Sequence, residues 1–389
     1  MVHYFCHAKK RLFFLSVAFN CIVWYIKVMK VLVVNSGSST LKFRIIDTKN
    51  EVTEIKGAIE KIGEKGAFYE FGKSGETKFA CENHGMAIRK MFELLGDIKI
   101  DCIGHRVVHG GEKWTKPVVA TEKVLLELDK ISYLAPLHNP ANILGVRECM
   151  KIMPAIRNVL VFDTAFHSTM PRSAFLYGLA YEDYQNYGIR KYGFHGTSHG
   201  YVSREAAKVL NKPIEQLKIV TCHIGSGASI CAVDGGKSVD TSMGFTPLAG
   251  VVMGTRCGDL DVSVVPVLCK KHKFSVDECL DYLNKKCGLL GLFGKSNDMR
   301  DIEREFGKNE RAEIAVSVFV NSLVKYIGAF IAEMGGCDAI VWTGGVGVNR
   351  PWIVDMAMTH FDYLPNVKRL VIPTNEELEI AMECNQILK

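Results

Sequence analysis

The sequence lacks the features that mark several large classes of protein. Its 13 cysteines are odd in number and include no C-x-x-C pair, which excludes a disulfide framework or a zinc site as the expectation and favours a reducing compartment. Past residue 28 it has no Lys/Arg-dense run, so nucleic acid is not an expected partner. Past the same point we find no apolar run long enough to span a bilayer, and no Pro/Ser-rich linker.

The sequence does have the composition of a globular protein. Its 389 residues, 48% hydrophobic and 23% charged, suffice for two domains and exclude a disordered chain. The 48 Lys and Arg exceed the 42 Asp and Glu by 6, but four of the basic residues lie in residues 1–28, which hold no acid. The remaining +2 is too small to indicate an acidic partner.

The first 28 residues are unlike the rest of the chain. An apolar stretch at 12–26 follows three basic residues, which is the layout of a signal peptide or a short anchor. The stretch is short for a bilayer span, no small-x-small cleavage site follows, and Met29 opens a strand-like segment. We therefore expect an upstream start codon and a cytoplasmic protein that begins at Met29, with a membrane-anchored form as the alternative.

Three segments share one design, an apolar strand that runs into a turn rich in glycine and hydroxyl side chains. They are 31–40 (VLVVNSGSST), 219–229 (IVTCHIGSGAS) and 339–349 (AIVWTGGVGVN). A second strand-like run follows each of the first two, so the sequence predicts the same hairpin twice and hence a duplicated domain.

Helical patterns lie between these strands, which favours an α/β fold. Asn139 and Pro140 are expected as the N-cap and first turn of one helix, which Pro154 closes. An apolar stripe over 316–334, ended by a Gly-Gly pair, predicts a long second helix. The boundary between the two halves is expected near 164–180, with the halves packed around a cleft.

Glycine turns after strands let backbone N–H groups converge on phosphate oxygens. One such turn alone is more often an ordinary hairpin turn, but three in one chain indicate a nucleotide. None matches the Walker pattern G-x-x-x-x-G-K-[ST] or the dinucleotide pattern G-x-G-x-x-G followed by a helix.

Histidine and arginine recur beside small residues in five short motifs. These are 104–111, 137–140, 163–167, 194–199 and 254–259. We discount the pairs His105/His109 and His195/His199 as metal sites, because the first lies in a β-branched run and glycine interrupts the second. A lone histidine is usually structural, but this group indicates a polar site. Arginines matter most there, since phosphoryl transfer needs fixed positive charge.

These motifs and several others resemble the acetokinase family, within the sugar kinase/Hsp70/actin superfamily, from Met29 to about Leu388. The matching segments are VLVVNSGSSTLKF, GHRVVHGGE, APLHNPAN, VFDTAFH, YGFHGTSH, CHIGSGAS, DTSMGFTPLAGVVMGTRCGDLD, SNDMRD and IPTNEELEIA, in this order. The resemblance implies two actin-like, ribonuclease H-like α/β domains around a central cleft. The expected units are 29–165 together with helix 376–389, on the acyl and phosphate side, and 166–375, on the nucleotide side.

The resemblance also implies an activity and partners. The expected reaction is reversible, direct in-line phosphoryl transfer from ATP to acetate, which gives acetyl phosphate and ADP. Mg²⁺ is the implied metal, with Mn²⁺ as an alternative, and the implied assembly is a homodimer.

Roles carry over onto matching positions. Arg106 and Arg256 are expected to clamp the carboxylate and the phosphoryl group, which His195 hydrogen-bonds, while Asp163 is the catalytic carboxylate. The residues expected to hold the metal are Asn35 and Glu376, with Asp163. Those expected to bind the acyl group are Arg106, Val108, Leu137, Phe194 and Pro247. Those expected to bind the nucleotide and its phosphates are Ser38, Thr40, Lys42, His138, His223, Ile224, Gly225, Ser226, Gly227, Gly344, Gly345, Val346, Gly347 and Asn349.

Four departures from the family pattern all lie on the donor side. Ser226 stands where asparagine is common, Ala249 where glutamate is usual and Val348 where the family has glutamate, and the stretch 350–370 is about twenty residues short. Two alternatives follow from the sequence: a kinase for propionate or another short acid, because one methylene changes binding by only about 1–3 kcal/mol, and a nucleotide-binding homologue with weakened turnover.

Overall fold

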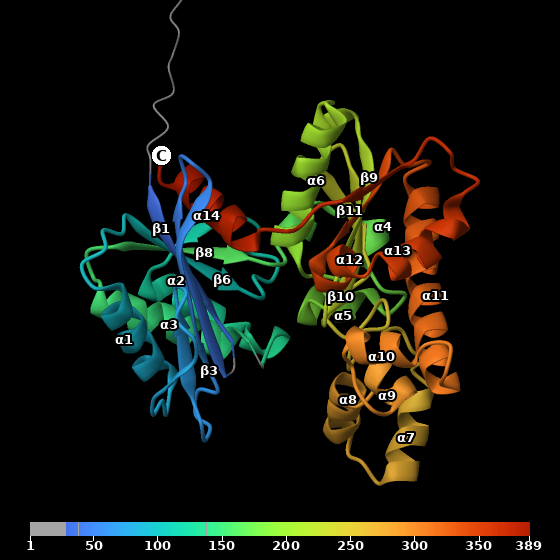
Figure 1. The fold of residues 1–389 in the computed structure, drawn as a ribbon, viewed down its shortest axis with the longest axis horizontal. Helices are drawn as coiled ribbons and strands as arrows, with labels where there is room; N and C mark the ends of the chain where they lie inside the picture. Colours follow the sequence, from blue (N-terminus) through green and yellow to red (C-terminus); the bar gives the residue numbers. More distant parts are fainter. Residues whose placement is uncertain (1–28, 38, 137) are drawn as a thin grey trace, which may run out of the picture.

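The computed structural model describes residues 29–389 apart from Ser38 and Leu137, so the segment 1–28 and its predicted role lie outside the described residues. The elements form two lobes, each built on one sheet (Figure 1). The fold is mixed α/β, as expected.

The first lobe contains an eight-stranded sheet in the order β5-β4-β3-β2-β1-β6-β8-β7. Its elements are β1 (Lys30–Ser36), β2 (Thr40–Asp47), β3 (Val52–Glu60), β4 (Phe68–Phe71), β5 (Thr77–Lys78), α1 (His84–Leu95), β6 (Cys102–Val107), β7 (Val118–Val119), α2 (Glu122–Lys130), η1 (Ser132–Leu134), α3 (Asn139–Ile152), β8 (Arg157–Phe162) and α14 (Glu376–Ile387). Strands β1, β6 and β8 run parallel, so their carboxyl ends meet at one edge of the sheet.

The second lobe contains a five-stranded sheet in the order β11-β10-β9-β12-β13. Its elements are η2 (Phe166–Thr169), α4 (Arg172–Phe175), α5 (Tyr181–Tyr187), α6 (Gly196–Leu210), η3 (Ile214–Gln216), β9 (Lys218–Ile224), β10 (Ala228–Asp234), β11 (Lys237–Thr241), α7 (Val264–His272), α8 (Val276–Lys285), α9 (Gly288–Phe293), α10 (Met299–Glu305), α11 (Glu310–Glu333), β12 (Ala339–Thr343), α12 (Gly344–Asn349), α13 (Pro351–Met358), η4 (Thr359–Phe361) and β13 (Lys368–Val371). Here β9, β12 and β13 run parallel.

The duplicated hairpin is confirmed. β1 pairs antiparallel with β2, and β9 pairs antiparallel with β10, each across a short Gly-Ser turn. The third glycine segment differs, because residues 344–349 form the short helix α12 directly after β12 instead of an open turn. Its strand runs parallel to β9, and the chain must leave the sheet edge through a helix to continue.

Both predicted helices are present, with one correction. The N-cap of α3 is His138 and not Asn139, whose buried side chain is used elsewhere: its Oδ1 accepts from the N–H of His109 at 3.1 Å and its Nδ2 donates to the carbonyl of His109 at 2.9 Å. α11 ends just before Gly335, which takes a left-handed φ of 65°.

The expectation that no later segment could span a bilayer is wrong by length and composition alone. Within residues 29–389, α11 is long and apolar enough to do so. Its apolar face, however, lies in the core of the second lobe, where Phe319, Leu323 and Ile327 pack against residues of the sheet such as Ile230 and Trp342. A core helix of a globular protein passes the same test.

The C-terminal segment returns from the second lobe to the first, where α14 packs on β1, β6 and β8 (Figure 1). Ile380 and Cys384 are fully buried against Val31 and Val159. A Cβ at Gly104 would come within 2.7 Å of Cys384 Sγ, so the helix fits only over a glycine in β6.

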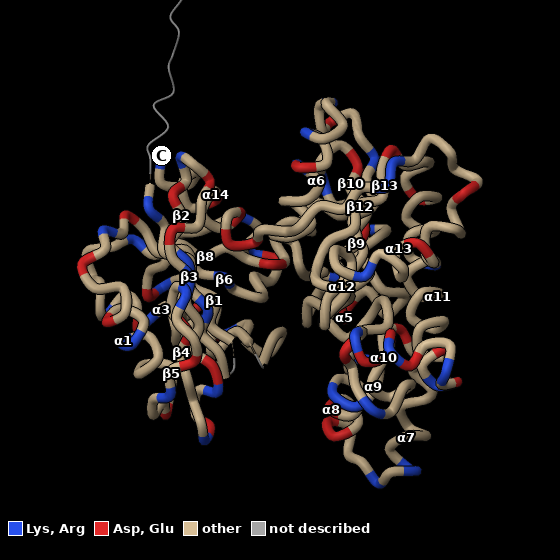
Figure 2. Tube along the Cα trace, in the orientation of Figure 1, with Lys and Arg blue, Asp and Glu red and all other residues tan. Residues whose placement is uncertain are grey.

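Acidic and basic residues are interspersed along both lobes, with no long stretch of one sign (Figure 2). All eleven cysteines among the described residues are free thiols. The domain boundaries expected from the sequence stay a prediction.

Candidate active site

The carboxyl edge of the first sheet brings three predicted residues together. Arg106 and Asn35 are each the last residue but one of β6 and β1, and Asp163 directly follows β8. The Arg106 guanidinium donates from Nε to Asp163 Oδ1 at 3.0 Å and from Nη2 to Oδ2, and Nη1 lies 3.5 Å from Asn35 Oδ1. This fork geometry fixes the direction of the guanidinium.

Glu376, the first residue of α14, joins the same cluster. Burial raises the pKa of Asp163, which is 1% exposed, against the opposing effect of Arg106, and burial raises the pKa of Glu376 as well. Burial alone would lower the pKa of Arg106, but the two carboxylates more than reverse this. Two carboxylates, Asp163 fully buried and Glu376 partly buried, thus lie near one guanidinium, which leaves the cluster short of positive charge.

His195 lies on a turn of the second lobe that touches this cluster. It precedes α6 with a left-handed φ of 57°, a conformation that costs energy in a residue with a side chain. The N–H of Gly196 donates to the carbonyl of Asp163 at 2.9 Å, and a Cβ on Gly196 would lie 2.3 Å from that oxygen. Glycine is therefore required for the two lobes to approach here.

The second glycine turn lies against His195 and Arg256. A Cβ at Gly227 would be 3.4 Å from Arg256 Nη1 and 3.5 Å from His195 Nε2, so both nitrogens face the same space beside the turn. The N–H of Gly254 donates to the carbonyl of Ser226 at 3.1 Å, which ties the arginine's loop to the turn. Arg256 Nη1 also lies 3.4 Å from the carbonyl oxygen of Pro247.

Two further predicted histidines lie within range of these charges. Burial lowers the pKa of His138, and the charges of Arg106 and Arg256 lower it further. Burial, aided by Arg106, lowers the pKa of His223 to about 4. The ring of His223 stacks on that of His195 with centroids 4.3 Å apart. The histidines at this site are therefore uncharged at neutral pH.

The predicted acyl-pocket residues are placed only in part. Val108 and Phe194 are buried and belong to one apolar cluster, although they come from different lobes. Pro247 is half-buried beside Arg256, and Leu137 lies outside the described residues.

Several of the predicted nucleotide residues line one cavity of about 600 Å³ in the second lobe. These are Gly225, Ser226, Gly345, Val346 and Asn349. Five more lining residues had been given no role from the sequence: Gly254, Asn297, Asp298 and Arg300, which lie in motifs it named, and Arg350. Gly344 and Gly347 form the start of α12 beside Ile224 and are not part of the wall. Gly344 has a φ of 76°, and a Cβ there would lie 2.6 Å from the carbonyl oxygen of Ile224.

The Gly-Ser turn between β1 and β2, which the sequence predicts to bind phosphate, makes fewer contacts with the two arginines. Lys42 pairs in register with Asn35, but its exposed ammonium lies 3.9 Å from Glu60, and no described contact joins it to Arg106 or Arg256. Thr40 starts β2, where its carbonyl accepts from the N–H of Gly37, and Ser38 lies outside the described residues.

Sequence reasoning missed the side chains that hold these turns. Asn142 on α3 donates from Nδ2 to the carbonyl of Ser36, and its Oδ1 accepts from the N–H of Val108 at 3.1 Å. His84 Nε2 lies 2.6 Å from the carbonyl oxygen of Gly37. Asn142 stands one helical turn after Asn139, and this pair of buried amides on one helix face was the available signal.

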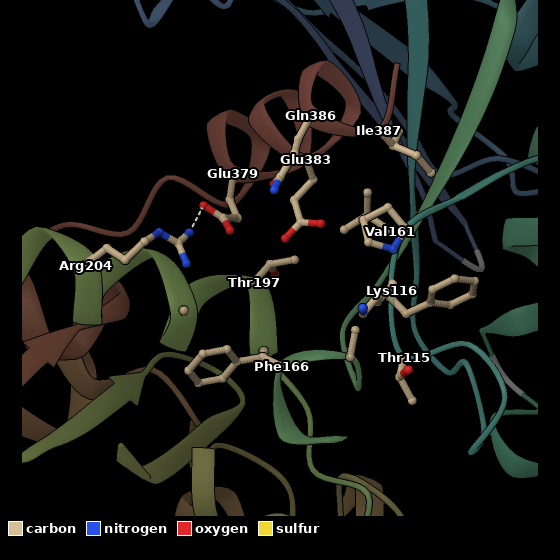
Figure 3. A pocket seen from close by; sticks show the side chains of 15 residues that line it. Thr115, Lys116, Val161, Phe166, Thr197, Arg204, Glu379, Glu383, Gln386 and Ile387 are labelled. Carbon is tan, nitrogen blue, oxygen red and sulfur yellow. Dashed lines mark ion pairs between the residues drawn. The ribbon is translucent and has the colours of Figure 1, made fainter. Parts of the chain in front are cut away.

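A second cavity, of about 430 Å³, lies behind the His195 turn between α6 and α14 (Figure 3). None of the residues predicted for the site lines it. Arg204 of α6 forms an ion pair there with Glu379 of α14, and Glu383 points into the same space (Figure 3). Its wall takes residues from both lobes, so it is a contact region between them.

Two sheets that repeat one strand–glycine-turn–strand unit, with charged side chains gathered where they meet, define an α/β protein of two actin-like domains. Residues 30–366 match the Acetokinase family, and the chain belongs to that family. Its members are kinases that use a carboxyl group as acceptor.

Known relatives cover nearly the whole chain. An acetate kinase of Caldicellulosiruptor bescii is 47% identical over 397 residues, covering 92% of this chain and 100% of the relative. The crystal structure of Porphyromonas gingivalis acetate kinase matches with a TM-score of 0.88 at 38% identity, over 93% of this chain and 100% of that one. A propionate kinase from Francisella tularensis matches with a TM-score of 0.86 at 38% identity, over 91% and 98%.

Proposed function

We propose that the chain is an acetate kinase, which transfers the terminal phosphoryl group of ATP reversibly and in line to acetate, giving acetyl phosphate and ADP. Kinase chemistry with a carboxyl acceptor is established by the family. The observation that carries the proposal is that the charges of Arg106, in the first lobe, and Arg256, in the second, both lower the pKa values of His138 and His195. Fixed charges from both lobes thus border one space.

The proposed mechanism needs no general base, because a carboxylate oxygen is already a nucleophile. Arg106, held by Asp163, orients the acetate carboxylate. Arg256 and His195 lie together at Gly227 and stabilise the charge on the equatorial oxygens of the phosphoryl group. His138 and His223 line the path of the phosphates, and alignment of acceptor and donor supplies the rest of the rate enhancement.

The residues fit Mg²⁺ bound jointly by protein and substrate. Among residues 29–389 outside the two gaps, no three His, Cys, Asp or Glu side chains are grouped to hold a metal. Asp163, which is buried, and Glu376, which is partly buried, nevertheless both lie near Arg106, whose guanidinium also reaches the Asn35 amide. Mg²⁺ keeps several waters and is bound by one or two carboxylates plus phosphates. When bound, it neutralises charge on the transferred group; Mn²⁺ is the alternative.

The donor site in this proposal is the cavity between the second glycine turn and α12. Gly345, in the first turn of α12, offers its backbone N–H to a phosphate, whereas the N–H groups of Gly225 and Gly254 already donate to carbonyls. Asn349 and Val346 border the nucleoside end. Ser226 is exposed in this cavity, where a hydroxyl replaces the amide common in the family.

Propionate is the second candidate acceptor. The Francisella tularensis propionate kinase matches this fold almost as well as the Porphyromonas gingivalis acetate kinase does. An apolar pocket discriminates one methylene by only about 1–3 kcal/mol. The homodimer, the cytoplasmic location and the two domains with their boundary at 165/166 are proposed on family membership alone.

The test is acyl phosphate formation, trapped as the hydroxamate, with Mg²⁺ and each of acetate, propionate and butyrate against ATP, GTP and pyrophosphate. We expect the highest kcat/KM with acetate and ATP, and a kcat of about 1–10³ s⁻¹. A higher kcat/KM with propionate would shift the assignment to that acid. No turnover with any donor, from folded protein that still binds nucleotide, would leave a nucleotide-binding homologue.

A further inference from the structure

A chain of hydrogen bonds runs from His195 through Ser229 and His199 to Thr221, and the mechanism proposed above assigns these last three residues no role. His195 Nδ1 is 2.8 Å from Ser229 Oγ, which is also 2.7 Å from His199 Nε2. The other nitrogen of that ring, His199 Nδ1, is 2.7 Å from Thr221 Oγ1. Ser229, His199 and Thr221 are fully buried, so water does not compete for these contacts.

The single hydroxyl proton of Ser229 locks the two histidines together. The oxygen lies between two ring nitrogens and can donate to only one of them, so the other nitrogen must carry a proton and donate to it. Burial lowers the pKa of both His195 and His199 well below 6.5, so each ring has one proton. Two arrangements remain, and in each the proton position on one ring dictates that on the other.

Thr221 plays a different part in each arrangement. In the first, His199 Nδ1–H donates to Thr221, whose hydroxyl must then donate to the carbonyl of Cys231, 3.4 Å away. In the second, the Thr221 hydroxyl donates to His199 Nδ1 at 2.7 Å. The 2.7 Å contact between Thr221 and His199 is a hydrogen bond in both arrangements, and the second gives up only the contact with Cys231, whose 3.4 Å is at the limit for a hydrogen bond. The contacts therefore allow both arrangements at nearly equal cost, and the proposed role of His195 as a donor to the phosphoryl oxygen selects the second.

We propose that Thr221, His199 and Ser229 are positioning residues that keep the proton of neutral His195 on Nε2, the nitrogen beside Arg256. The order of donation is Thr221 hydroxyl to His199 Nδ1, His199 Nε2–H to Ser229, and Ser229 hydroxyl to His195 Nδ1. His195 Nε2–H then faces the space beside Gly227, ready to donate to a phosphoryl oxygen. The opposite arrangement would present a lone pair to that oxygen.

This inference deepens the proposed function and rests on it for the identity of the acceptor oxygen, but the proton positions can be measured without turnover. The experiment is histidine-selective ¹⁵N NMR of the full chain at neutral pH, with the two rings assigned from the variants His195→Gln and His199→Gln. We expect both rings to show an unprotonated Nδ1 and a protonated Nε2. A proton on Nδ1 of His195, or protons on both of its nitrogens, would overturn the proposal whether or not the protein is an acetate kinase.

Paired variants test whether the line of hydrogen bonds matters for rate. Thr221→Val keeps the shape but removes the proton donor to His199, so His195 should become a mixture of both neutral forms. We expect kcat to fall on the order of tenfold, less than the roughly 10²–10³-fold cost of deleting a donor outright, with the KM for acetate unchanged. Thr221→Ser restores the hydroxyl and should restore both the ¹⁵N spectrum and kcat.

Unchanged proton positions and unchanged kcat in Thr221→Val would refute the role of Thr221. A fall in kcat that Thr221→Ser fails to reverse would indicate a packing effect and would also count against the proposal. If Thr221→Val does not fold, the spectrum of the unmodified protein still decides which nitrogen of His195 carries the proton.

Discussion

Glu383 offers a test of the contact region between the lobes, because folding raises the pKa of its carboxyl group into the neutral range. Burial raises its pKa from 4.5 to about 7, and the neighbouring Glu379 adds to the effect, against the weaker influence of Arg204. The Glu379 carboxylate is itself paired with Arg204, so Glu383 has no cation of its own.

The sign of the pH dependence follows from these values. Between about pH 4.5 and 7 the folded protein retains a proton that the unfolded chain releases, so the stability contributed by Glu383 is full below 4.5 and is lost as pH rises through 7. The pKa difference corresponds to at most about 3 kcal/mol. For a chain of this length, the entropy of unfolding converts that to a change in Tm of about 4 °C at most.

Glu383→Gln keeps the shape but cannot ionise. Its Tm should exceed that of the unmodified protein by up to about 4 °C at pH 8, and the difference should shrink toward zero as pH falls below 4.5. Thermal unfolding followed by circular dichroism across that range measures both quantities. Glu313→Gln, on the exposed face of α11, is the matched control and should change Tm equally at both ends. A Glu383→Gln protein that is no more stable at pH 8 than the unmodified one would refute the reasoning.

Four further predictions concern the site and the leader. Arg256→Ala should lower kcat in the hydroxamate assay by about 10²–10³-fold with an unchanged Tm, and an unchanged kcat would contradict its assigned role. Gly344→Ala should raise the KM for ATP and lower Tm, because its Cβ would lie 2.6 Å from a carbonyl oxygen; Gly345→Ala, with nothing within 4 Å, should do neither. Removing divalent metal with EDTA should stop acyl phosphate formation and Mg²⁺ should restore it, whereas full activity in EDTA would exclude the metal. Protein that starts at Met29 should be soluble and as active as the full chain, and a need for residues 1–28 would revive the anchor.

The parts of the fold that depend on neighbouring residues were predictable from the sequence. The two Gly-Ser hairpins and α11 follow from strand alternation, turn chemistry and helical spacing within a few residues. The same local argument misplaced the start of α3, because Asn139 is a good N-cap by type, yet its amide is committed to a loop thirty residues earlier in the chain. It also missed α12, whose helical form depends on the sheet that precedes it.

Some residues of the candidate site could likewise be predicted from the sequence, and others could not. Arg106 and Asp163 could be expected together because they lie at the carboxyl ends of two adjacent parallel strands. Thr221 and Ser229 could not be expected, since they are ordinary hydroxyl residues in strands and become notable only when folding places a buried histidine between them. The roles assigned to the site residues stay predictions until the variants are measured.

The return of α14 to the first lobe bears on how the protein is made. The ribosome releases residues 29–162 first, but the sheet they form exposes the apolar surface of Val31 and Val159 until Ile380 and Cys384 arrive to cover it. During synthesis the first lobe therefore waits, unfinished, while the whole second lobe emerges. A chain that ends at Asn375 would leave this surface open to chaperones and proteases, and would also lack Glu376.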